Sequence, residues 1–70
     1  MDNNNLVKMA NNIGTFFKSE PDRELAINEV EQHLRNFWEP RMRAEIIECV
    51  ENGDNQLLDI VAEAVRRLKR

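Results

Sequence analysis

Apolar residues recur at intervals of three and four along most of the chain, which is the period of an amphipathic helix and not of a strand. Pro21, Pro40 and Gly53 divide this pattern. A proline cannot continue a helix but can open one, and a glycine commonly follows the last helical residue. The 70 residues therefore predict an all-α fold, a small compact bundle of three to four helices joined by short loops. We expect a single domain over residues 1–70.

Each predicted segment has its own apolar stripe, which we expect to face the core. The second segment, over roughly residues 20–37, is expected to be the longest. The four stripes are Leu6, Met9, Ala10, Ile13, Phe16 and Phe17; Ile27, Val30, Leu34 and Phe37, widened by Ala26 and Trp38; Met42, Ile46, Ile47 and Val50, beside Cys49; and Leu57, Leu58, Val61, Val65 and Leu68.

Helix starts are predicted from residues whose side chains can cap a first turn. These are one of Asn3, Asn4 and Asn5 for the first segment, Ser19 followed by Pro21 for the second, and Asp54, Asn55 or Asp59 for the last. Gly14 interrupts the first segment, where glycine is about 1 kcal/mol less favourable than alanine. A close approach of another helix and a local bend both explain it, and the sequence leaves both open.

A chain of this size buries only about 60% of the surface that its unfolded form exposes, so small domains usually need a staple, a metal or a partner. One Cys and one His exclude an intrachain disulfide and a His-rich metal site. The single Cys also favours a reducing, cytoplasmic setting. Self-association of the isolated chain, or docking onto a larger protein, remains as a way to bury more surface.

Two classes of partner are disfavoured by the sequence. The first residues lack the basic start and apolar stretch of a signal peptide, and no apolar run approaches the roughly 18 residues of a membrane helix. The formal net charge of −3 argues against a nucleic-acid binder, which usually carries a basic excess. The basic end, residues 66–70, is expected to complement a helix dipole, with an anionic partner surface as the alternative.

Candidate catalytic residues have simpler structural explanations. Cys49 lies beside Ile46 and Val50 in the apolar pattern, so we expect a packed thiol and not a nucleophile. The two glycines form no phosphate-binding pattern, and the carboxylates lie mostly on polar helix faces. We therefore expect no catalytic, cofactor-binding or metal-binding residues, and a chain that is not itself an enzyme.

The stretch from Phe37 to Arg43 is the best candidate for a docking surface, because Trp and Arg are enriched where proteins bind tightly. We predict partner-binding roles for Trp38, Arg41 and Arg43, and weaker ones for His33 and Asn11. Both arginines are expected to be exposed and to contribute little to folding. Solvated charges beside a structural Trp, or a recognition helix that enters DNA, are the alternatives.

Three segments carry a family resemblance. The chain reads Leu-Val-x-Met-Ala-Asn-x-Ile-x-x-Phe-Phe over residues 6–17, His-Leu-x-x-Phe-Trp over residues 33–38, and Pro-Arg-Met-Arg over residues 40–43. In this order they resemble the delta subunits of NAD-dependent, molybdenum-containing formate dehydrogenases. The last helical segment fits only as an apolar pattern.

The resemblance implies a non-catalytic partner of the large molybdopterin-bearing subunit, associated with assembly or cofactor maturation. Such a complex oxidises formate to carbon dioxide and passes electrons through iron–sulfur clusters and flavin to NAD. The delta subunit itself is expected to hold no cofactor. A free-standing helical regulator that binds DNA and a homodimeric structural protein are the other hypotheses.

If the chain has no ligand set of its own, the purified protein will be helical and free of bound metal, iron and flavin. Circular dichroism, elemental analysis and an absorption spectrum measure this directly. A metal at one equivalent per chain would contradict the non-catalytic interpretation.

Overall fold

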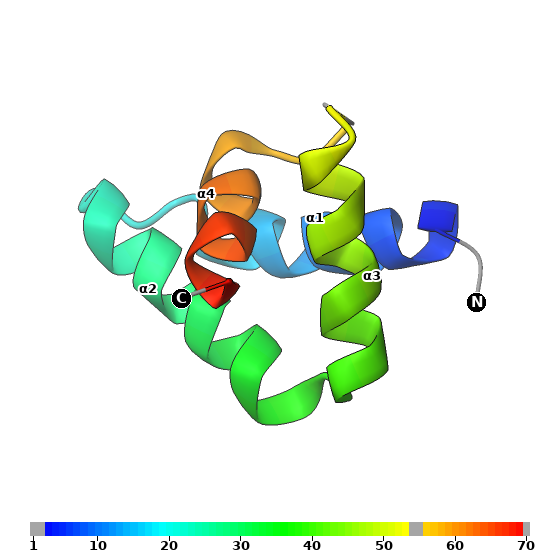
Figure 1. The fold of residues 1–70 in the computed structure, drawn as a ribbon. Helices are drawn as coiled ribbons and strands as arrows, with labels where there is room; N and C mark the ends of the chain where they lie inside the picture. The colour runs from blue at the N-terminus through cyan, green and yellow to red at the C-terminus, as the bar shows by residue number, and fades with distance from the viewer. Residues whose placement is uncertain (1–2, 54–55, 70) are drawn as a thin grey trace.

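The computed structural model describes residues 3–53 and 56–69 and confirms the all-α prediction over this part of the chain. It contains four helices: α1 (Asn3–Phe17), α2 (Arg23–Phe37), α3 (Pro40–Glu51) and α4 (Asp59–Leu68). In Figure 1, α2 and α3 diverge from the short connection that joins them at the bottom of the view. α1 crosses behind, and α4 lies in front, so that all four helices surround one interior.

The core draws on every helix, and α4 packs most extensively against α2. The Cα radius of gyration is 10.8 Å, close to the value of about 11 Å expected for a compact chain of this length. The completely buried apolar side chains are Leu6 and Ala10 of α1, Ile27, Val30 and Leu34 of α2, Ile46 of α3, and Val61, Ala64 and Val65 of α4. Most of these residues were predicted from the helical period alone.

The apolar stripes were wrong at three large residues. Phe16 is 77% exposed, Phe37 is 74% exposed and Met9 is 36% exposed, although all three were predicted to face the core. Val7, which the predicted stripe omitted, is buried instead. The buried face of α1 is therefore rotated relative to the prediction, away from Met9 and Phe16 and toward Val7.

The predicted start of α2 was also wrong. The cap is Asp22 and not Ser19: its Oδ1 accepts hydrogen bonds from the backbone N–H groups of Glu24 (3.1 Å) and Leu25 (3.3 Å). Pro21 thus lies before the cap and not in the first turn. Because α2 begins at Arg23, it has 15 residues, the same number as α1, and is not the longest element.

The described residues show no predicted side-chain cap at the start of α4, and most of the predicted caps of α1 lie outside the described side chains. Leu58 is the residue before α4 and occupies the N-cap position, where its side chain makes no capping hydrogen bond. Asp59 is the first residue of α4, whereas Asp54 and Asn55 lie outside the described residues. α1 begins at Asn3 with Asn5 inside it, and the side chains of Asn3 and Asn4 are outside the described part.

Pro40 and Gly53 mark the bounds of α3 as predicted. Glu39 is extended, with φ −69° and ψ 153°, and Pro40 is the first residue of the helix. Gly53 has φ +83°, the left-handed conformation that favours glycine, and its N–H donates to the carbonyl of Val50 at 3.1 Å.

Gly14 marks a close approach between α1 and α4, which settles the question that the sequence left open. A Cβ added there would overlap Cγ2 of Val61 and would lie 3.1 Å from Cδ1 of Leu58. The missing side chain lets the first turn of α4 and the residue before it pack directly on the backbone of α1.

Gly14→Ala is therefore expected to destabilise the domain by about 1–3 kcal/mol, the usual range for overpacking a close contact. In a Val61→Ala background the obstructing methyl group is gone, and the same change is expected to be stabilising by up to about 1 kcal/mol through helix propensity. Urea unfolding of the four proteins of this double-mutant cycle measures the reversal of sign. An identical effect of Gly14→Ala in both backgrounds would contradict a steric role for Val61.

Candidate docking surface

Trp38 belongs to the core, although the sequence suggested it for docking. Its side chain is 6% exposed and packs in the same cluster as Leu34 and Ile46. As the C-cap of α2, it donates its backbone N–H to the carbonyl of Leu34 at 3.1 Å. The indole therefore fills the space where α2 turns into α3, and it leaves little surface for a partner.

Arg43 was expected to be exposed, but it is half-buried, because its side chain reaches back to the end of α2. Its Nη1 donates to the carbonyl oxygens of Arg35 (3.1 Å), Leu34 (3.5 Å) and Trp38. The last carbonyls of a helix lack partners within the helix and form the negative end of its dipole. The guanidinium thus serves as a C-terminal cap delivered from the first turn of α3.

Asn11 also has an internal role. Its Oδ1 accepts from the N–H of Leu58 and its Nδ2 donates to the carbonyl of Gln56, both at 2.9 Å. One amide group from α1 therefore holds the segment that leads into α4, whose first turn has no side-chain cap of its own.

Arg41 and His33 differ from these three residues. Arg41 is exposed, and no hydrogen bond or ion pair holds its guanidinium within the described part of the chain. His33 is half-buried, and its ring centroid lies 4.8 Å from that of Phe37. The five predicted docking residues do not form one surface, since Trp38, Arg43 and Asn11 point into the domain. Their partner-binding roles stay predictions.

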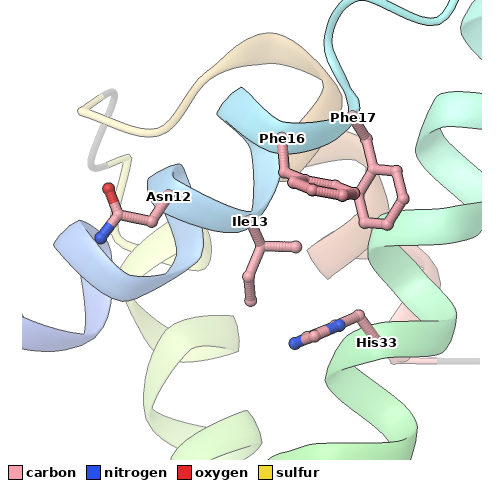
Figure 2. Close-up of a pocket in the computed structure, with 5 residues that line it drawn as sticks. All are labelled: Asn12, Ile13, Phe16, Phe17 and His33. Carbon is pink, nitrogen blue, oxygen red and sulfur yellow. The ribbon is translucent and has the colours of Figure 1, made fainter.

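A surface that the sequence did not reveal lies between α1 and α2. Asn12, Ile13, Phe16, Phe17 and His33 line a pocket of about 320 Å³. In Figure 2, Ile13 and His33 point toward the same space from two helices, and the rings of Phe16 and Phe17 lie beside it. These two rings meet edge to face, with centroids 4.9 Å apart. We call these five lining residues, together with Phe37 against His33, the aromatic groove.

The charged groups gather elsewhere, mainly between α2 and α4. Both carboxylate oxygens of Glu24 accept from Nη2 of Arg67 at 2.9 Å, and Arg67 also lies 3.6 Å from Glu63. Arg35 pairs with Glu31 at 2.9 Å and donates to the carbonyl of Arg67. The hydrogen bond that Arg67 donates to the Glu24 carboxylate raises the pKa of Arg67 above its usual value. The basic end, which was predicted to complement the helix dipole, also pairs with α2 through Arg67. Arg70 lies outside the described residues.

The remaining candidates for chemistry are Cys49 and possible metal ligands. Cys49 is buried, as expected for a packed thiol. Among the described residues, no three His, Cys, Asp or Glu side chains are grouped so that they could hold a metal ion. Within the same part of the chain, no helix is long and apolar enough to cross a bilayer.

Comparison with known families supports the resemblance seen in the three sequence segments. The model of the family described as NADH-dependent formate dehydrogenase delta subunit FdsD matches residues 5–65. The chain belongs to the FdsD family. No curated protein and no solved structure matched the chain. The FdsD match covers all of α2 and α3 and most of α1 and α4, and it therefore includes both walls of the aromatic groove.

The two arginines of this delta subunit are expected to differ in their effect on folding. Arg43→Ala removes a charged donor from the end of α2 and should destabilise the domain by about 1–3 kcal/mol. Arg41→Ala, two residues away, should change the free energy of unfolding by less than about 0.5 kcal/mol, as is usual for exposed sites. Chemical unfolding followed by circular dichroism compares them. Equal changes in the free energy of unfolding would show that the hydrogen bonds from Arg43 to the end of α2 do not stabilise the domain.

Proposed function

We propose that this delta subunit is a non-catalytic subunit of an NAD-dependent formate dehydrogenase that binds the large, molybdopterin-bearing subunit and supports assembly or cofactor maturation. The complex would work in the cytoplasm, which is consistent with a chain that has one cysteine. In this proposal the chemistry of formate oxidation and electron transfer to NAD belongs to the other subunits.

The family match over residues 5–65 carries the proposal. The surface of the domain supports it independently, because two phenylalanines are about three-quarters exposed in a chain of 70 residues. Exposed aromatic clusters are typical of protein-binding sites, where Phe, Trp and Tyr are enriched. The aromatic groove offers such a cluster without any change in the fold.

Binding can support assembly through mass action alone. A subunit that binds the folded form of its partner, and not the unfolded form, stabilises the partner by an amount that grows with concentration. By this route the delta subunit would favour a large subunit competent to receive or retain its cofactor. Arg41 and His33, which are accessible at the surface, remain candidates for contacts with the large subunit.

Co-expression of the large subunit with and without a tagged delta subunit tests the proposal. We expect the tagged chain to capture the large subunit, and we expect omission of the chain to lower the molybdenum content and the formate-dependent reduction of NAD. Adding back the purified delta subunit during maturation should restore both. A large subunit that is fully loaded and active without the delta subunit, and that is not captured by it, would show that the proposal is wrong.

A further inference from the structure

We propose that the aromatic groove of this delta subunit receives the uncharged, apolar face of a helix from another subunit of the formate dehydrogenase complex. The inference rests on the proposed function and specifies the surface and the chemistry of its partner. It differs from the prediction based on Trp38, Arg41 and Arg43, which lie at the turn between α2 and α3.

The chemistry of the groove selects against charged partners. Its lining consists of the apolar Ile13, Phe16 and Phe17 with Asn12 and His33, and contains no carboxylate, lysine or arginine. Arg35, Arg66 and Arg67 are paired with carboxylates of α2 and α4, none of which lines the pocket. An acidic peptide, a nucleic acid or a lipid headgroup would therefore meet no complementary charge in the groove. An apolar, neutral surface matches its lining.

The shape of the groove favours an extended occupant over a small molecule. A pocket of about 320 Å³ is at the lower end of the range for small ligands, which are usually largely enclosed by their sites. Here Phe16 and Phe37 are 77% and 74% exposed, so most of their ring surface lies outside any enclosed space. An occupant that covers both rings must extend beyond the pocket. A partner helix that lies along α1 and α2 would extend beyond the pocket and cover both rings. Its side chains at spacings of three and four residues would be the anchors.

Two observations point to a different subunit as the source of that helix. Membership of the FdsD family places the chain among the subunits of a larger enzyme. In addition, no helix of the described chain is left to supply the occupant, since all four contribute buried residues to the same core. Pairing of two delta subunits through their grooves is a distinct outcome that the experiment below separates.

Lysine substitutions on the aromatic groove test the proposal. Phe16 and Phe37 lie in the last turns of α1 and α2, where a lysine is favourable to the helix dipole, so Phe16→Lys and Phe37→Lys are expected to fold normally. Leu25→Lys is the control for the same change outside the groove, because Leu25 is 42% exposed on α2 and does not line the pocket. It lies in the first turn of α2, where a lysine opposes the helix dipole, so circular dichroism is used to compare the folding of all three variants. Binding is measured to the remaining subunits of the complex, purified without the delta subunit. Each groove variant is expected to bind roughly tenfold more weakly or worse, while the control binds as wild type does.

The possible results distinguish the groove from the proposed function. If the wild-type chain does not bind the other subunits, both proposals are wrong. If it binds and the groove variants bind as tightly as Leu25→Lys, the docking function stands and the groove is not its site. If the wild-type chain is a dimer by sedimentation, and the groove variants are monomers that still bind the other subunits normally, the occupant is a second copy and the inference is overturned.

A cross-linking measurement identifies the occupant without relying on altered affinity. A photoreactive phenylalanine analogue at position 37 is expected to cross-link to an apolar helical segment of another subunit in the assembled complex. The same analogue at position 25 is expected to give no such product. Cross-links from position 37 to a charged loop, or to no subunit, would contradict the inference.

Discussion

The close approach of α1 and α4 at Gly14 constrains which face of α1 turns toward the core. With no Cβ at this position, Val61 and Leu58 pack against the backbone of α1. This contact fixes the rotation of α1 about its axis. At about 3.6 residues per turn, Met9 and Phe16 lie roughly 140–160° around the helix from Gly14. When Gly14 faces α4, these two residues must turn away from it, and Phe16 becomes one wall of the aromatic groove. Packing inside the domain and the surface that it offers are thus set by the same contact.

Side chains from neighbouring helices complete the helix ends, which gives the domain cohesion without a disulfide or a metal. Asn11 on α1 holds the segment that enters α4, and Arg43 on α3 caps the end of α2. Neither cap is local to the helix that it completes. Loss of tertiary structure would therefore leave two helix ends unsatisfied at once, so helix formation and core packing are coupled. Such coupling suits a short chain in which isolated helices of this length would be marginal.

The helical period and the breaks in it were enough to predict the fold, the bounds of α3 and most of the core. The errors arose where tertiary contacts decide between local options. Ser19 and Asp22 are both acceptable N-cap residues, and only the structure shows that the helix begins after Asp22. The sequence showed seven apolar residues along α1 but not which of them a neighbouring helix would cover. Gly14 did indicate which face of α1 is covered, because a glycine inside a helix often marks a close contact. The sequence does not say which residue makes that contact.

At the candidate site, too, the sequence did not predict which of two adjacent aromatic residues is buried. Trp38 was favoured for docking because tryptophan is enriched at interfaces, and Phe37 was expected in the core because its spacing matched the stripe. In the structure Trp38 is buried, as its place at the edge of the predicted stripe also indicated, with 6% of its surface exposed, whereas Phe37 is 74% exposed. α2 ends at Phe37, so the extended backbone of Trp38 departs from the helical rotation and directs the indole inward. The enrichment of tryptophan at interfaces does not predict this change in the direction of the side chain. Pro40, two residues later, does indicate it, because a proline cannot continue the helix. At this helix end, Trp38 therefore closes the core, and the ring of Phe37 stays at the surface.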